Sequence, residues 1–204
     1  MHSSVRFELR GSTLIIVLQS PDQFPRLTKS VLQELTTRFE SIPADSAVGA
    51  AIITGTPQSF AAGADIAEVS LLTPLEALSF SALGQSLMRA VESCSKPVIA
   101  AIRGYCLGGG FDLALACHLR IAGNDAQFGH PGGSLGIITG WGGTARLPRI
   151  VGQAHARELL VTGRVITAAE AYSMHLVSRV VPPEEVLDAA MEIARHHAQD
   201  YNRP

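Results

Sequence analysis

Short apolar runs alternate along the chain with longer segments whose apolar residues recur at helical spacing. The first two runs, 5–9 and 14–18, flank Arg10-Gly11-Ser12 and predict a β-hairpin whose second strand enters a buried sheet. Later runs rich in β-branched residues predict further buried strands, at 48–54, 97–102, 118–122 and 176–181.

The helical segments fall between these strands. Thr28 and Asp65 are suitable N-caps for helices that reach residues 42 and 69, and Thr167-Ala-Ala-Glu170 is a capping-box pattern. Further helices are predicted at 74–94, 108–117, 144–150, 153–162 and 183–199. The alternation predicts an α/β fold in one domain, 1–204, with a core to about residue 181 and a terminal helix at about 183–199.

Composition excludes several classes of function. Hydrophobic residues make up 47% of the 204-residue chain and charged residues 17%, which indicates a folded protein. With a net charge of −2 and no basic stripe, the chain has no means of neutralising phosphates, so we expect no nucleic-acid partner. The apolar runs are too short to span a bilayer and no leader is apparent, so we expect a cytoplasmic protein without a membrane partner.

The cysteines indicate neither a disulfide framework nor a metal site. Cys94, Cys106 and Cys117 are odd in number and lack the spacing of metal ligands. We therefore expect reduced, buried thiols and no bound metal.

Two segments place residues with little or no side chain at the end of apolar runs. The first, 59–65, is either a tight turn in which Gly63 supplies an unusual φ or a turn whose Ala64 N–H faces a cleft. The second, 104–112, holds Gly108-Gly109-Gly110, which would cost about 1 kcal/mol each inside a helix. We interpret these glycines as permitting close packing and a bare N–H toward a substrate. Two such N–H groups that converge would stabilise an oxyanion, as in enzymes acting on carbonyls.

Other glycine motifs are ruled out. The glycines between 104 and 110 do not fit the G-x-G-x-x-G pattern of dinucleotide binding. The sequence also has no G-x-x-x-x-G-K-[ST] phosphate loop and no G-x-S-x-G nucleophile elbow.

Asp112 lies in the otherwise apolar run 107–116, where a carboxylate is either paired or functional. Its alternatives are a salt bridge with Arg103 or Arg120 and an acid/base role beside the oxyanion site. Two glycine-dense segments, 128–132 and 140–144, are suited to lining a flat acyl chain. His130 lies in the first of them and is interpreted as a hydrogen-bonded structural residue, because no partner is visible in the sequence.

Six segments, taken in order, resemble one known family. They read Ser-Phe-Ala-Ala-Gly-Ala-Asp-Ile at 59–66, Lys-Pro-Val-Ile-Ala-Ala-Ile-Arg-Gly-Tyr-Cys-Leu-Gly-Gly-Gly at 96–110, Phe-Gly-His-Pro at 128–131, Gly-Gly-Thr-Ala-Arg-Leu-Pro-Arg-Ile-Val-Gly at 142–152, Ala-Arg-Glu-Leu-Leu-Val-Thr-Gly-Arg at 156–164 and Leu-Val-Ser-Arg-Val-Val at 176–181. Over nearly its whole length the chain resembles the enoyl-CoA hydratase/isomerase (crotonase) superfamily.

The resemblance implies a fold, a substrate class and an assembly. The fold is a crotonase-like spiral of ββα turns, with a C-terminal helical region that is short compared with the family's. The substrate is an acyl-CoA thioester, with coenzyme A as part of the substrate and no separate cofactor. The assembly is a homotrimer or hexamer.

The resemblance also assigns roles to residues. The oxyanion N–H groups fall on Ala64 and Gly109, and the acid/base falls on Asp112. The residues expected to bind substrate are Arg26, Ala62, Asp65, Ile66, Gly108, Pro131, Gly132 and Ile137.

Two positions depart from the family pattern. Hydratases of fatty-acid oxidation have a glutamate where this chain has Asp112, whose carboxylate stands about one bond length further back. They have a second glutamate where this chain has Gly132. The sequence therefore predicts a site with at most one carboxylate near the reacting water.

Four functions fit these observations. The first is hydration or isomerisation of an enoyl-CoA with Asp112 as acid/base. The second is another reaction through an enolate, either a decarboxylation or one like that of dihydroxynaphthoyl-CoA synthases, in which an anion such as bicarbonate replaces the missing glutamate. The third is a catalytically weak acyl-CoA-binding paralogue, and the fourth is a structural subunit of an oligomer.

Overall fold

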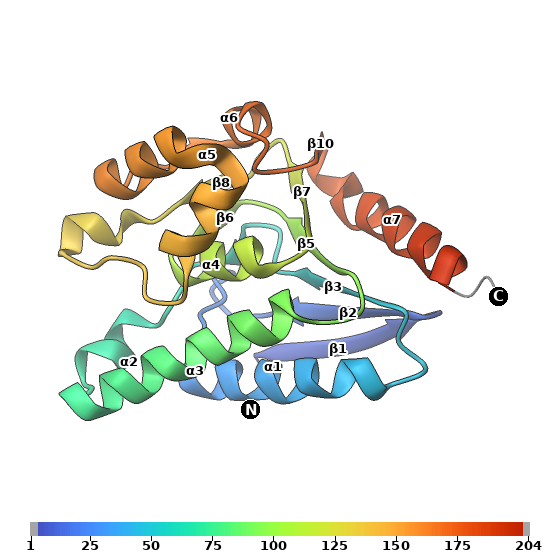
Figure 1. Ribbon diagram of the computed structural model, residues 1–204, viewed down its shortest axis with the longest axis horizontal. Coiled ribbons are helices and arrows are strands. Elements are labelled where there is room, and N and C mark those ends of the chain that lie inside the picture. Colours follow the sequence, from blue (N-terminus) through green and yellow to red (C-terminus); the bar gives the residue numbers. More distant parts are fainter. Residues whose placement is uncertain (1–3, 202–204) are drawn as a thin grey trace.

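Two β-sheets form the centre of the molecule, and the computed structural model describes residues 4–201 (Figure 1). The strands of the larger sheet are, in spatial order, β1 (Val5–Arg10), β2 (Thr13–Leu18), β3 (Ala50–Thr54), β5 (Val98–Ile102), β7 (Leu119–Gly123) and β10 (Arg179–Val181). The strands of the smaller sheet are β4 (Ser59–Ala61), β6 (Tyr105–Leu107), β8 (Gln127–Gly129) and β9 (Ile166–Thr167). Only the β1–β2 and β8–β9 pairs are antiparallel among the paired strands described.

The helices follow the strands in a repeating order. The α-helices are α1 (Lys29–Ser41), α2 (Ile66–Ser70), α3 (Pro74–Glu92), α4 (Gly109–Ala116), α5 (Gly143–Thr162), α6 (Ala168–Ser173) and α7 (Val186–Tyr201). The 3₁₀ segments are η1 (Ile42–Ala44), η2 (Pro131–Leu135) and η3 (Pro183–Glu185). Three times in succession the chain adds a strand to the larger sheet, a strand to the smaller sheet and then a helix. This is the spiral of ββα turns that the family resemblance implies.

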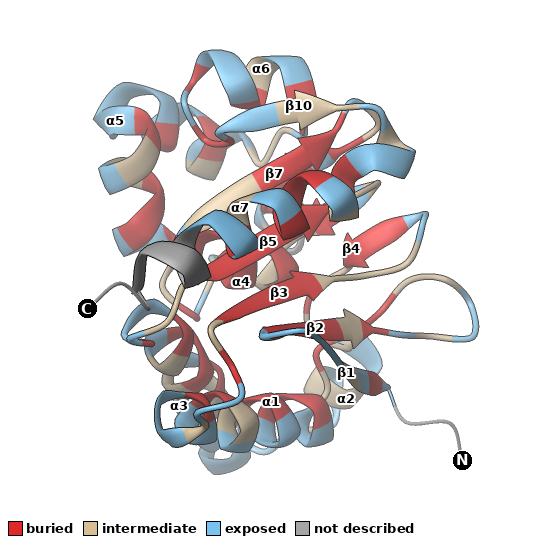
Figure 2. Cartoon of the chain, turned by 90° about the vertical axis from the view of Figure 1, so that its right-hand side faces the viewer, coloured by how far each residue is buried: buried red, intermediate tan, exposed pale blue. Residues whose placement is uncertain are grey.

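The central strands of the larger sheet are apolar on both faces, and helices cover both faces there. Ile52 and Ile99 face α7, where they pack with Ala190 and other small residues of that helix. Figure 2 shows α7 lying across the buried strands β5 and β7. The opposite face, with Ile53 and Ile102, joins the main core with α1, α3, α4 and the smaller sheet. Parallel strands buried on both faces read as continuous apolar runs, which is why the sequence predicts β3 and β5 correctly.

Several sequence predictions are confirmed in detail. The hairpin forms with Val5 paired to Leu18, and the Thr28 and Asp65 side chains cap α1 and α2. Thr167 forms the predicted capping box with Glu170 at the start of α6. The two helices predicted around residue 152 form one element, but Gly152 is non-helical within it (φ 80°), so the predicted break exists.

Other predictions need correction. The four strands of the smaller sheet are at most three residues long, too short to show a periodic pattern, and the sequence missed them. The strand predicted at 176–181 begins only at Arg179, because Leu176 and Ser178 bond instead to the backbone of α6 and β7. None of the helices in the described part of the chain is long and apolar enough to cross a membrane.

The three cysteines are buried free thiols, as the sequence predicts. Burial raises the pKa of Cys117 to about 12 and raises the pKa of Cys106 well above its usual range. The thiolate is the reactive form of cysteine, so both groups are protected by protonation as well as by packing.

We therefore expect iodoacetamide at mildly alkaline pH to modify Cys106 and Cys117 slower in the native protein than in denaturant, by roughly a hundredfold or more. Mass spectrometry of the labelled peptides measures this. Equal labelling rates for Cys117 in the folded and denatured protein would contradict it.

Candidate active site

The loop after β4 presents a backbone donor to a cleft. The Ala62 N–H donates to the Pro25 carbonyl and the Leu27 N–H donates to the Gly63 carbonyl, each at 2.8 Å. Gly63 has a φ of +97°, which favours glycine, and it reverses the chain before α2 begins. Among the described residues no acceptor bonds to the Ala64 N–H that follows. Hydrogen bonds to Pro25 and Leu27 thus hold the loop in place, and the Ala64 N–H is left without an acceptor among the described residues.

The start of α4 presents a second backbone donor beside the first. The Gly108 N–H donates to the Gly129 carbonyl (2.9 Å), and a φ of +53° then turns the chain into the helix. The Gly109 N–H has no acceptor among the residues that the structure describes. A Cβ placed on Gly63 would lie 3.0 Å from the Gly109 nitrogen, so the two loops are in contact. The bare N–H groups of Ala64 and Gly109 therefore belong to one small region.

Trp141 forms a wall of this region and depends on two glycines. A Cβ on Gly84 of α3 or on Gly109 would lie 2.2 Å from the indole ring. The Phe80 ring packs against the same indole at a centroid distance of 5.5 Å. Because the ring lies where both side chains would be, α3 and α4 enclose it from two sides.

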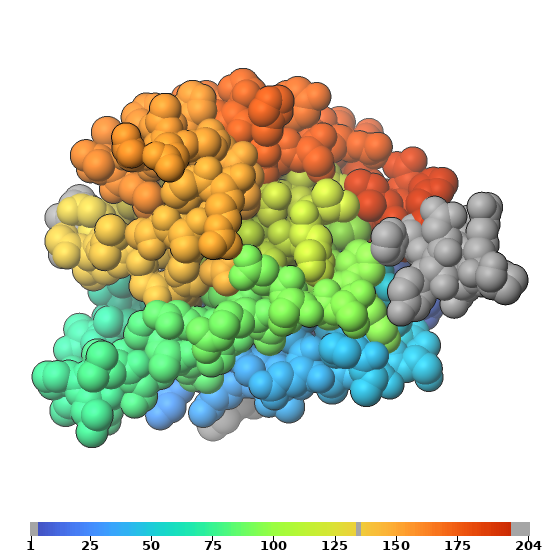
Figure 3. Space-filling model, viewed as in Figure 1, coloured from blue at the N-terminus to red at the C-terminus, as the bar shows by residue number. Residues whose placement is uncertain are grey.

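Arg146 fixes the segment that carries Trp141. Its guanidinium donates to the Trp141 carbonyl (3.0 Å) and forms an ion pair with Glu92 at the end of α3 (2.6 Å). In Figure 3 the green surface of α3 lies directly below the orange surface of the first turns of α5. The contact therefore joins the C-terminal end of α3 to the N-terminal end of α5.

A pocket of about 440 Å³ opens over the two bare N–H groups. Its walls combine backbone atoms of the glycine loops with apolar side chains such as Val69, Phe80 and Leu107. The sequence-predicted residues that line it are Ala62, Ala64, Ile66, Gly108, Gly109, Asp112, Pro131, Gly132 and Ile137. The structure thus gathers all the predicted site residues except Arg26 and Asp65.

Arg26 and Asp65 have other partners. The Arg26 guanidinium lies 2.8 Å from Asp22, and this ion pair lowers the pKa of that carboxyl. The Asp65 carboxylate accepts from the Ala67 and Glu68 N–H groups at the start of α2. Asp65 therefore acts as the helix cap that the sequence also predicts, next to the pocket but outside its lining.

Asp112 is fully buried and both of its carboxylate oxygens are bonded. Oδ1 lies 2.9 Å from Nε2 of His130, and Oδ2 accepts a hydrogen bond from the Thr139 hydroxyl. Asp112 is 1% exposed and His130 is 7% exposed. A Cβ on Gly143 would lie 2.3 Å from Oδ1, so only glycine leaves room for this cluster.

The salt bridges considered for Asp112 from the sequence are wrong. Arg103 lies beside Asp125 at 3.9 Å. Arg120 donates to the carbonyls of Leu176, Ala114 and Cys117, and burial lowers its pKa. These carbonyls include those at the C-terminal end of α4, where a cation is favoured.

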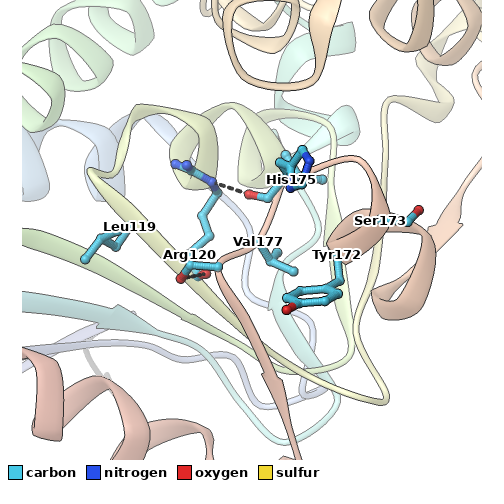
Figure 4. Close-up of a pocket in the computed structure, with 8 residues that line it drawn as sticks. Leu119, Arg120, Tyr172, Ser173, His175 and Val177 are labelled. Carbon is cyan, nitrogen blue, oxygen red and sulfur yellow. Dashed lines mark hydrogen bonds between the residues drawn. The ribbon is translucent and has the colours of Figure 1, made fainter.

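Arg120 lines a second hollow, of about 430 Å³, on another part of the surface. Figure 4 shows its bond to the Leu176 carbonyl and the neighbouring Tyr172 and His175. The guanidinium is occupied by main-chain acceptors, so this hollow holds a structural arginine rather than one free for a ligand.

The sequence analysis missed the partnership of Asp112 with His130 and Thr139. The hydrogen bond predicted for His130 is confirmed, but its partner is 18 residues earlier in the chain and on another element. No periodic or local pattern connects these positions. The sequence feature that could have indicated the pair is that an acid in an apolar run, Asp112, and a histidine, His130, both lie in segments predicted to line the pocket.

Gly132 carries no side chain where the family pattern has its second glutamate. A Cβ there would lie 3.1 Å from the Ile137 carbonyl oxygen, a contact that requires a small shift of the loop. Asp112 is the one carboxylate among the described residues that line the pocket.

Comparison with known proteins shows the family of this chain. The family model described as enoyl-CoA hydratase/isomerase matches residues 8–203. The chain belongs to the enoyl-CoA hydratase/isomerase family.

Named members of this family are similar along most of the chain. A crotonyl-CoA hydratase from Syntrophomonas wolfei is 43% identical over 95% of this chain and 75% of its own length. A short-chain-enoyl-CoA hydratase from Clostridium acetobutylicum is 40% identical over 94% of this chain and 74% of its own. The crystal structure of an enoyl-CoA hydratase from Bacillus anthracis has a TM-score of 0.92 at 36% identity and covers 96% of this chain and 77% of that one.

The close contact between Gly84 and the Trp141 indole, which forms a wall of the pocket, can be tested by substitution. Gly84→Ala places a methyl group inside the indole ring's volume, so we expect a loss of about 1–3 kcal/mol in the free energy of unfolding. A double-mutant cycle with Trp141→Phe, measured by denaturant unfolding, tests whether the two effects couple.

The matched control is Gly133→Ala, because a Cβ at Gly133 meets nothing within 4 Å. Equal losses for the two glycine substitutions, or simple additivity with Trp141→Phe, would contradict the packing described.

Proposed function

We propose that the chain binds an acyl-CoA thioester and hydrates an enoyl-CoA. The observation that carries this proposal is the pair of unbonded N–H groups, at Ala64 and Gly109, on adjacent loops of one pocket. A thioester oxygen placed between them gains two hydrogen bonds as it becomes an enolate. In other enzymes, removing one donor of this kind lowers kcat by about 10²–10³-fold. The relatives named as hydratases support the reaction.

Proton transfer in this proposal takes place at the Asp112 end of the pocket. Water adds its oxygen to the β-carbon while the enolate forms, and a proton then returns to the α-carbon. Asp112 and its partner His130 are the titratable groups among the described residues lining this pocket. The apolar walls at Val69, Phe80 and Leu107 suit a short acyl chain.

The rest of the substrate assignment follows from the resemblance. We propose that Ala62, Ile66 and Ile137 contact the coenzyme A and acyl portions, since they line the same pocket. Arg26, expected from the resemblance to bind substrate, is the candidate for a contact with the coenzyme A phosphates, in competition with its ion pair to Asp22. We also retain the trimer or hexamer as a proposal that analytical ultracentrifugation tests.

We expect the protein to hydrate crotonyl-CoA, with a kcat that falls by about 10²-fold or more in Asp112→Asn, because the buried carboxylate supports the proton transfer. The loss of enoyl-thioester absorbance measures the reaction. Asp188→Asn, an exposed change on α7, is the matched control and retains the wild-type rate.

The failures of this test are informative. Equal slow rates in wild type and Asp112→Asn would remove Asp112 from the mechanism. Binding of butyryl-CoA without turnover indicates an acyl-CoA-binding paralogue, and no binding indicates a structural subunit.

Gly132 favours a second candidate, an enolate reaction in which a small anion replaces the missing carboxylate. In that case bicarbonate raises the rate of α-proton exchange on butyryl-CoA in heavy water, and Gly132→Glu removes the dependence. If the protein instead hydrates an enoyl-CoA with groups at the Asp112 end of the pocket, we expect bicarbonate to change this exchange rate by less than about twofold. The reason is that the proton donor is then already part of the protein. Mass spectrometry of the recovered thioester measures the exchange.

A further inference from the structure

One ring nitrogen of a histidine that lines the pocket with the two bare N–H groups has no hydrogen-bond partner among the described residues. Nε2 of His130 bonds to Asp112, but Nδ1 has no hydrogen-bond partner among the residues that the structure describes. The side chain is 7% exposed and lines the same pocket as Ala64 and Gly109. A ring nitrogen on a pocket wall that has no protein partner is available for a hydrogen bond to a ligand or to water. Its position therefore points to a group that enters the pocket.

Asp112 selects the tautomer of the neutral imidazole. Oδ2 of Asp112 accepts from the Thr139 hydroxyl, and Oδ1 lies 2.9 Å from Nε2 of His130. An ionised carboxylate can only accept, so beside it the hydrogen of a neutral ring lies on Nε2. The Nδ1 atom then carries a free lone pair and can accept a proton. Both carboxylate oxygens are thus bonded to protein groups, which makes Asp112 poorly placed to take the proton itself.

The ring is also held in orientation. The Phe111 ring packs against it at a centroid distance of 4.8 Å. A Cβ on Gly143 would lie 2.9 Å from its Cε1 atom, so the backbone closes on the ring from another side. A base that is packed on two sides and bonded at one nitrogen loses little entropy when it acts.

On the basis of the proposed function, we propose that Nδ1 of His130 is the acid/base of the reaction and that Asp112 and Thr139 are positioning residues. Nδ1 removes a proton from water as the water oxygen forms its bond to the β-carbon. The electron pair of the carbon–carbon double bond moves into the thioester, whose oxygen is held by the two N–H groups. The imidazolium then returns the proton to the α-carbon, so that one water is added in total and His130 is neutral again.

This assignment explains both departures from the family pattern. An aspartate that is too short to reach a substrate still orients a histidine, whose ring extends the reach of the pair. One group that takes and returns the same proton also removes the need for a second carboxylate at Gly132. The first proton acceptor and the final donor lie on the same face of the substrate.

The test is His130→Ala assayed with crotonyl-CoA. We expect kcat to fall by about 10²–10⁴-fold, while KM and the Kd for butyryl-CoA change by less than about threefold. Added imidazole restores part of the kcat of His130→Ala and none of that of Asp112→Asn. His130→Gln keeps a donor toward Asp112, so it covers the case in which His130→Ala fails to fold, and we expect the same loss of kcat.

The control is His155→Ala, an exposed change on α5 that retains the wild-type kcat. A kcat for the His130 variants within about threefold of wild type, or a loss confined to KM, overturns the role of His130 and leaves the proposed hydratase intact. A wild type that neither hydrates crotonyl-CoA nor exchanges the α-protons of butyryl-CoA overturns both.

Discussion

The close approach of two backbone segments, without intervening side chains, is the constraint on which the site depends. The loop at Gly63 touches the start of α4 at Gly109, and a Cβ on Gly110 would lie 2.3 Å from the Ala61 carbonyl. Any side chain at these points would separate the segments and with them the two bare N–H groups. Helix propensity is given up here, at about 1 kcal/mol for each glycine in a helix interior, for a geometry that only backbone atoms can form.

The lack of a side chain at Gly143 also allows the polar cluster around Asp112 to be buried. Removing a carboxylate from water is costly, and two hydrogen bonds to Asp112 offset that cost. The absence of a side chain at Gly143 lets the helix α5 begin directly over the cluster. Preorganised groups in a water-poor site act more strongly on a developing charge than the same groups in solvent, which links this packing to the proposed function.

The parts of the fold that were predictable from the sequence are those with local signals. Buried strands such as β3 and β5, the caps at Thr28 and Asp65 and the break at Gly152 each depend on residues close in the chain. The strands of the smaller sheet have no such signal, because three residues show no period and their pairing is set by the spiral.

By itself the sequence determined the α/β architecture, the family and the two glycine-containing backbone segments that line the pocket, since these depend on local patterns and on residues that lack side chains. The tertiary structure alone decided the partners of Asp112. Arg103 and Arg120, the partners considered from the sequence, pair with other groups. One partner is His130, which follows β8 and lies 18 residues further along the chain. Pairing of buried charges depends on which side chains meet in space, and the spiral brings α4 and the end of β8 together in a way that no spacing along the chain records.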